Sequence, residues 1–339
     1  MQWKWKGPYE GGITQSLMVA YEQDPFSFVL YYGLGLEEPA ELEPNLPWGT
    51  VFHKGLEVAL ENPKRIKDFT PEEWALVRRA VLDECKFYPQ LSQVSQLSIL
   101  TMLKLYDDSY KQECISIETE VEFRKPYTTQ HGSKVHIMGK VDGYCMTTSH
   151  TPLLLEHKCK GSYDRFQFRK EAETDLQINL YAYAMDVYNI LYDNITIPEL
   201  KYGAPKQQVQ ETHLSYINRL YNTHQYGAYP VIYNKLEWLD QYPFSITKEF
   251  NELYRQQTID PIIDQICELY EYCSQDSFDI HNPTCFNKIF YKRPLRLFDP
   301  SQAPKFKKKY WLYLTNQLDF ENLKPVEHLF KELSKVTKE

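Results

Sequence analysis

The segments KVHIMGKVDGY at residues 134–144 and LLLEHK at residues 153–158 decide the fold of this chain. The first alternates polar and apolar side chains with the period of a β-strand, and the second is a short strand that begins apolar. A third segment, ISIETEVEF at residues 115–123, alternates in the same way and precedes the turn at residues 131–133. We therefore expect a hairpin followed by a third strand.

Helical patterns flank these strands. In TPEE at residues 70–73, Thr70 can cap a helix, a proline suits its first turn and Glu73 completes a capping box, which predicts a helix to about residue 86. The stripe on residues 173–191 consists of Leu176, Leu180, Tyr183, Val187 and Leu191. Further helices are expected at residues 49–62, 91–106 and 244–274, and a strand near 195–201. The pattern predicts a mixed α/β core at residues 115–191.

Composition bounds the class of protein. The chain has 339 residues, 42% of them hydrophobic and 25% charged, and a net charge of −8. This length allows two domains, or one large domain with an elaborate flank. The acidic balance argues against a protein that coats nucleic acid without catalysis, because such a protein needs a broad basic surface. An enzyme that acts on DNA stays open, since it needs positive charge only along one groove.

The seven cysteines include no CxxC pair. At this chain length we expect no disulfide scaffold and infer a reducing compartment. No apolar run reaches the ~18 residues of a membrane span, and the opening MQWKWKGPYE lacks the apolar core of a signal peptide. We expect a cytoplasmic protein without a membrane partner.

Two carboxylates and a lysine carry the chemical signal. Glu156 and Lys158 lie two apart on a strand and therefore leave it on one face. If the strands pair, Asp142 converges with Glu156 and the two carboxylates form a hard oxygen site for Mg²⁺ or Mn²⁺. A nearby ammonium group can help deprotonate a water, which suits phosphodiester hydrolysis. A surface strand that carries an ion pair would give the same pattern.

Two helical pairs complete the pattern. Gln177 and Tyr181 lie four apart, as do Gly49 and His53, so each pair shares a helix face. Taken alone, His53 is more often structural than a ligand. Together the motifs read GxxxH at 49–53, GxxD at 139–142, ExK at 156–158 and QxxxY at 177–181.

In this order the four motifs resemble the RecB-type branch of the PD-(D/E)XK nuclease superfamily, which includes CRISPR-associated and phage exonucleases. The resemblance covers about residues 49–185. It implies a restriction-endonuclease-like mixed sheet flanked by helices. With it we expect an N-terminal helical region at residues 1–110, a nuclease core at 111–205 and a mostly helical C-terminal region at 206–339.

The resemblance also implies roles. Asp142, Glu156, His53 and the backbone carbonyl of His157 would bind Mg²⁺ or Mn²⁺. Lys158 would position or activate the attacking water, and Gln177 and Tyr181 would support the site and contact the DNA backbone. Some relatives hold an iron–sulfur cluster, but here Asp24-Pro25 replaces the upstream cysteine-proline and Cys285 lacks close companions. We therefore expect no such cluster.

Basic and aromatic residues near the site predict where DNA would bind. The segment at residues 158–173 interleaves basic side chains with aromatic rings, which suit phosphates and unpaired bases. A second basic run is KFKKKYW at residues 305–311. A solvated surface is the alternative reading of both. The expected contacts are Lys160, Arg165, Arg169, Lys170, Lys307 and Lys308.

The sequence is thus interpreted as a metal-dependent deoxyribonuclease, an exonuclease of phage or bacterial DNA recombination or processing. Two alternatives stay open. One is a nuclease-fold protein that binds DNA or a partner without catalysis. The other is a nuclease subunit that requires a helicase or annealing partner.

Overall fold

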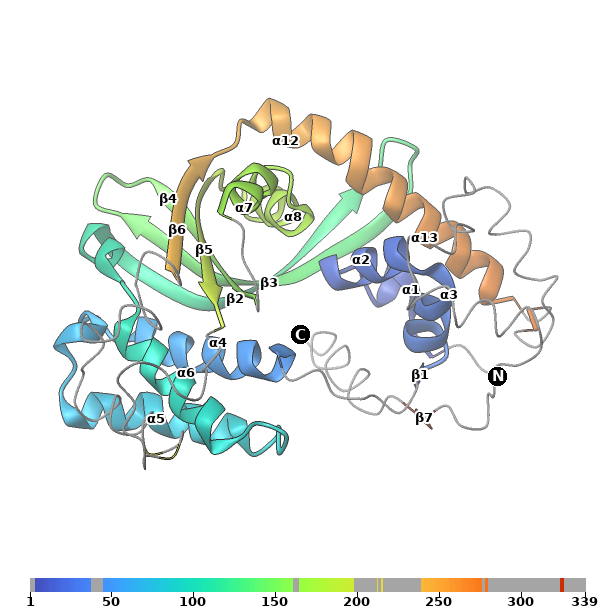
Figure 1. The fold of residues 1–339 in the computed structure, drawn as a ribbon. Coiled ribbons are helices and arrows are strands. Elements are labelled where there is room, and N and C mark those ends of the chain that lie inside the picture. Colours follow the sequence, from blue (N-terminus) through green and yellow to red (C-terminus); the bar gives the residue numbers. More distant parts are fainter. Residues whose placement is uncertain are drawn as a thin grey trace. The chain divides into compact units, whose positions relative to one another are not determined.

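A five-stranded mixed sheet positions the functional residues (Figure 1). The computed structural model describes residues 4–37, 45–160, 165–197, 239–275, 278–279 and 324–325, with the single positions 212 and 215. The strand order is β2-β3-β4-β5-β6. β4 pairs antiparallel with β3 and parallel with β5, and β6 returns antiparallel to β5. The strands are β2 (Cys114–Thr128), β3 (Lys134–Thr147), β4 (Pro152–Lys160), β5 (Asn189–Thr196) and β6 (Leu239–Ser245).

Helices cover both faces of this sheet (Figure 1). On one face lie α4 (Asn45–Glu61), α5 (Pro71–Cys85) and α6 (Gln93–Leu105), and on the other lie α7 (Arg165–Ala172) and α8 (Leu176–Met185). The capping box that Thr70 and Glu73 predict at the start of α5 is formed. The core between α4, α5 and α6 contains Phe52, Val81 and Leu103, all fully buried. The expected mixed sheet flanked by helices is confirmed.

The described residues belong to two compact units, each discontinuous in sequence. One combines residues 42–122 with 140–248, and the other combines residues 1–41, 123–139 and 249–339. The division expected from the sequence, with boundaries at residues 110 and 205, stays a prediction. The second unit contains α1 (Gly7–Glu10), α2 (Gln15–Gln23), α3 (Pro25–Phe28), a π-helix (Val29–Gly33), most of α12 (Lys248–Tyr254), another π-helix (Arg255–Ile259) and α13 (Asp260–Cys273), with β1 (Leu36–Glu37) paired to β7 (Lys324–Pro325).

Several expected boundaries are wrong. The helix expected at residues 173–191 ends at Met185, because Asp186 adopts a left-handed conformation with φ of 54°. The chain then enters β5 at Asn189, six residues before the expected strand. The helix expected from residue 244 begins at Lys248, after β6. Apolar spacing alone did not separate a short helix from the buried strand that follows it.

Cysteine chemistry differs from expectation at one pair. A disulfide joins Cys114 on β2 to Cys145 on β3, with the two Cα atoms 6.1 Å apart. Neighbouring strands bring together cysteines 31 positions apart, which spacing in the sequence did not reveal.

Asp24, which stands where some relatives have a cysteine, has a structural role here. Its side chain accepts a hydrogen bond from the backbone of Phe26 and caps α3. Within the described residues, no helix has the length and apolar character needed to cross a membrane.

Candidate active site

The site lies where β3 and β4 stop pairing. Their antiparallel register runs from Met146 opposite Pro152 to Gly143 opposite Leu155. Asp142 and Glu156 are therefore the first residues beyond the last pair. There the carboxylate of Asp142 replaces the missing strand partner, because its Oδ2 accepts the backbone N–H of His157 at 2.7 Å.

Glu156 and Lys158 face α8. Glu156 Oε1 accepts hydrogen bonds from Lys158 Nζ at 2.6 Å and from Gln177 Nε2 at 2.8 Å. Lys158 Nζ also donates to Gln177 Oε1 at 2.5 Å, which closes a triangle of three side chains. Asp175 caps α8 by accepting from the backbone of Gln177 and Ile178. The cap fixes the first turn of α8, and with it the position of Gln177.

The opposite face of β4 meets α4. A Cβ atom added at Gly49 would lie 3.3 Å from Cβ of Cys159, so a larger residue would push α4 away from the strand. One turn later, His53 Nδ1 lies 3.5 Å from Asp142 Oδ1. The GxxxH spacing thus has a physical reason. Gly49 lets α4 lie close to β4, and His53, one helical turn later, then reaches the carboxylate of Asp142.

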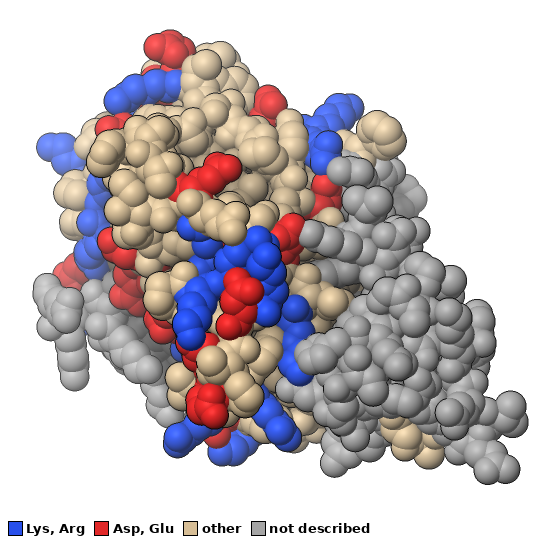
Figure 2. All heavy atoms as spheres, turned by 90° about the vertical axis from the view of Figure 1, so that its left-hand side faces the viewer, with Lys and Arg blue, Asp and Glu red and all other residues tan. Residues whose placement is uncertain are grey.

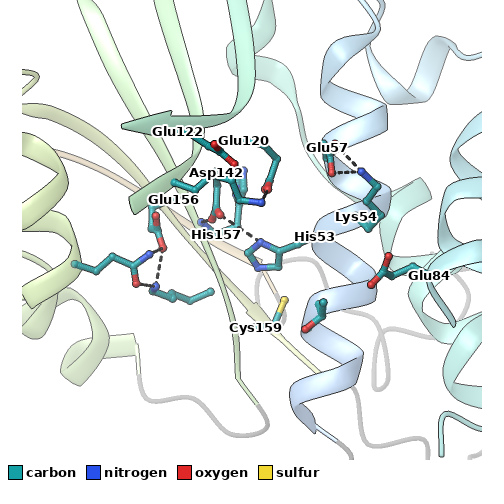
Figure 3. A pocket seen from close by; sticks show the side chains of 15 residues that line it. His53, Lys54, Glu57, Glu84, Glu120, Glu122, Asp142, Glu156, His157 and Cys159 are labelled. Atoms are coloured by element: carbon teal, nitrogen blue, oxygen red, sulfur yellow. Dashed lines mark hydrogen bonds and ion pairs between the residues drawn. The ribbon is translucent and has the colours of Figure 1, made fainter. Parts of the chain in front are cut away.

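One pocket of about 650 Å³ is lined by His53, Asp142, Glu156, Lys158 and Gln177, among others (Figure 3). Figure 3 shows Asp142, Glu156 and His157 grouped on the strands, with His53 facing them from α4. The carboxylates that line the pocket outnumber its lysines by six to three. They are Glu57, Glu84, Glu120, Glu122, Asp142 and Glu156, and the lysines are Lys54, Lys140 and Lys158. Lys54 pairs with Glu57 and Lys140 pairs with Glu120.

The two central carboxyl groups differ in pKa. Burial opposes ionisation of Asp142, but the charge and hydrogen bond of His53, together with the His157 backbone, hold its pKa well below the usual range. Burial, with the nearby charge of Asp142, raises the pKa of Glu156 to about 7 despite Lys158. In the absence of a cation, Asp142 is the ionised member and Glu156 readily carries a proton.

The basic groups respond in the opposite sense. Burial alone would lower the pKa of Lys158, but the charges of Glu156 and Asp175 raise it. Burial would likewise lower the pKa of His53, and Asp142 raises it well above the usual value. Lys158 is therefore a fixed ammonium group at neutral pH rather than a ready proton acceptor.

Comparison with known proteins assigns the family. A model of the PD-(D/E)XK nuclease superfamily matches residues 13–190, more than half of the chain. This span contains Asp142, Glu156 and Lys158 in their observed arrangement. The chain belongs to the PD-(D/E)XK nuclease superfamily.

Solved structures similar to this PD-(D/E)XK chain are distant from it. A structure described as SSO0001 is 14% identical, with 73% of this chain and 84% of that chain covered and a TM-score of 0.29. A phage-related exonuclease from Haemophilus somnus 129PT is 12% identical, with 64% and 94% covered and a TM-score of 0.28. A search of curated proteins finds no match.

The donor set fits a divalent cation. In this PD-(D/E)XK protein the Oε2 atom of Glu156 is buried and has no hydrogen-bond partner among the described residues. Asp142 supplies a second carboxylate, and oxygen ligands are those that Mg²⁺ and Mn²⁺ prefer. No three acidic, histidine or cysteine side chains in the described part already enclose a metal position. The Oε2 atom without a partner is nevertheless where a cation would satisfy a costly buried group.

Tyr181 lies one turn after Gln177 on α8. It is buried on α8 and hydrogen-bonds to Gln177 and to the backbone of Lys140. Burial and the charges of Glu156 and Asp142 raise its pKa far above that of free tyrosine, so its hydroxyl stays protonated. Tyr181 does not line the pocket, unlike the other five side chains expected there.

The expected DNA contacts fall in different environments. Lys160 and Lys170 are exposed, and Lys160 lies 5.4 Å from the centre of the Phe168 ring. Arg169 donates two hydrogen bonds to the carboxylate of Asp240, at 3.0 and 2.5 Å, and stacks over Tyr242. Its guanidinium is thus engaged within the protein. Lys307 and Lys308 lie outside the described residues, and so does the side chain of Arg165.

Figure 2 shows Lys and Arg side chains gathered near the middle of the face drawn there, with Asp and Glu among and around them. This face carries charge of both signs rather than a continuous basic surface. A DNA contact would therefore depend on a few side chains.

Sequence reasoning missed the residues that support the site. Asp175 precedes an apolar helix start, which is a capping signal that could have revealed it. Asp193 and Tyr106, which contact the ring of His157, carry no signal in the sequence because tertiary packing alone brings them together.

Proposed function

We propose that this protein is a divalent-cation-dependent deoxyribonuclease that hydrolyses phosphodiester bonds and leaves 5′-phosphate ends. We further propose that it acts as an exonuclease in phage or bacterial DNA processing. The observation that carries the proposal is the convergence of Asp142, Glu156 and Lys158 in one pocket, with Glu156 Oε2 buried and unpartnered. Membership of the nuclease superfamily supports the reaction type.

The charge of the pocket supports dependence on a cation. Even with Glu156 protonated and His53 charged, five carboxylates face four cationic side chains, and this negative balance disfavours a DNA phosphate. Asp142, Glu156, His53 and the carbonyl of His157 are the groups that would hold a divalent ion. Such an ion supplies charge neutralisation on the phosphate and lowers the pKa of the attacking water.

The protein's own groups would perform the remaining work. Lys158 is held between Glu156 and Gln177 at 2.6 and 2.5 Å, so its ammonium group has a fixed direction. From there it would orient the attacking water and stabilise charge that develops on the phosphate. The 3′ oxygen would leave, and the phosphate would stay on the 5′ side of the next nucleotide.

End-labelled linear DNA and uniformly labelled circular DNA, each single- and double-stranded, test this function when incubated with Mg²⁺ or Mn²⁺. We expect release of 5′-phosphorylated products from linear DNA and little cleavage of closed circles, because an exonuclease needs an end. Cleavage should disappear in EDTA.

Variants assign the activity to the site. We expect Glu156→Ala and Lys158→Ala each to reduce cleavage by a factor of a hundred or more while folding survives. Lys54→Ala is the matched control, because it removes another pocket-lining lysine that pairs with Glu57 rather than with Glu156. Undiminished cleavage in both site variants would contradict the assignment.

A further inference from the structure

The side chain of His157 has no role in the reaction proposed above. Along β4 it alternates with Glu156 and Lys158 and therefore leaves the other face of the strand. There it enters a cluster that is almost closed to solvent. The exposed fractions are 3% for His157, 0% for Asp193 and 3% for Tyr106.

The carboxylate of Asp193 organises this cluster. Its Oδ2 atom accepts hydrogen bonds from His157 Nδ1 at 3.1 Å, from the Tyr106 hydroxyl and from Gln241 Nε2 at 3.3 Å. The geometry fits the tautomer of His157 in which Nδ1 donates to this shared acceptor. These four side chains join β4, β5 and β6 to the end of α6.

Stability alone does not explain such a cluster. The Nε2 atom of His157 and the Oδ1 atom of Asp193 are buried without a partner among the described residues. Each such atom costs free energy, and apolar side chains of similar volume would fill the space without that cost. Buried polar groups that lower the stability of the fold beside a candidate active site point to a role in arranging that site.

The connection runs through the backbone of His157. Its N–H holds the carboxylate of Asp142 at 2.7 Å, just beyond the last pair of β3 and β4. The pairs between β3 and β4 end before this peptide, whereas on its other side β4 stays paired with β5 through residue 157. The ring of His157, held by Asp193, adds a second attachment to β5 at the same position. We propose that His157 is a positioning residue: Asp193 and Tyr106 fix its ring, and the fixed residue orients the carboxylate of Asp142.

This inference rests on the proposed function in one respect, namely that Asp142 binds the cation. Its first test needs no cation. In metal-free full-length protein, hydrogen exchange of the residue-157 amide reports the hydrogen bond to Asp142 directly. We expect this amide to exchange at least tenfold faster in His157→Leu and in Asp193→Leu, because both variants lose the hydrogen bond between the ring and residue 193.

The second readout is the dissociation constant for Mn²⁺, measured from free Mn²⁺ by electron paramagnetic resonance. Loss of a residue that orients a metal ligand weakens binding about 10- to 100-fold, and we expect that range for both variants. Asn189→Ala is the matched control. It removes a contact between the same two strands, from Asn189 Nδ2 to the carbonyl of Pro152, at a distance from the site.

The outcomes are distinct. Unchanged exchange at residue 157 in a folded Asp193→Leu variant overturns the proposal, and this variant, similar in shape to aspartate but without an acceptor, decides the matter if His157→Leu does not fold. Equal acceleration in Asn189→Ala also overturns it, since the effect would then be general loosening. If the unaltered protein neither binds Mn²⁺ nor cleaves DNA, the proposed function fails while amide exchange still decides the role of His157.

Discussion

Replacing Glu156 with glutamine should stabilise the metal-free protein by an amount that grows as the pH rises above about 4.5. The pKa of Glu156 is raised from 4.5 to about 7, chiefly by burial. A raised pKa means that the folded state binds this proton more tightly than the unfolded state. The contribution is complete below pH 4.5 and is lost as the pH rises to about 7.

Glutamine mimics the protonated side chain and does not titrate. Each pKa unit corresponds to 1.36 kcal/mol, so the full shift amounts to about 3 kcal/mol. From the two pKa values, Glu156→Gln should be more stable than the unaltered protein by about 1 kcal/mol at pH 5 and about 3 kcal/mol at pH 8.

Urea unfolding in EDTA at pH 5 and pH 8, followed by tryptophan fluorescence, measures this difference. Addition of Mn²⁺ at 100 times its dissociation constant should remove most of this difference at pH 8, because binding stabilises the unaltered protein by about 2.7 kcal/mol and the variant by much less. Equal stability at pH 8 in EDTA, or a difference independent of pH, would refute the reasoning.

Two further predictions concern packing. Gly55→Ala should lower the free energy of unfolding by about 2 kcal/mol, because the added Cβ would lie 2.4 Å from Cδ1 of Leu103; denaturation curves that overlay those of the unaltered protein would contradict this. Arg169→Ala should lower it by about 1–3 kcal/mol, since the carboxylate of Asp240, whose side chain is 4% exposed, loses two hydrogen bonds from the guanidinium. Asp240→Asn combined with Arg169→Ala should recover part of that loss, and a double variant no more stable than Arg169→Ala would argue against the ion pair.

The local pattern of residues predicted much of the fold and the core of the site. Alternation predicted β2 and β3, a short apolar start predicted β4, and the capping box placed the start of α5 at Pro71. The pattern also selected Asp142, Glu156, Lys158 and His53, which line one pocket. These features were readable because periodicity and capping act between residues close in sequence.

Only the tertiary structure decided what surrounds that core. The disulfide of Cys114 with Cys145, the ion pair of Arg169 with Asp240, and the contact of Asp193 with His157 all join residues distant in the chain. The pKa of Glu156 depends on the same packing, because burial is its largest cause. A sequence states which groups are present, whereas burial and neighbours far along the chain determine their charge and their partners.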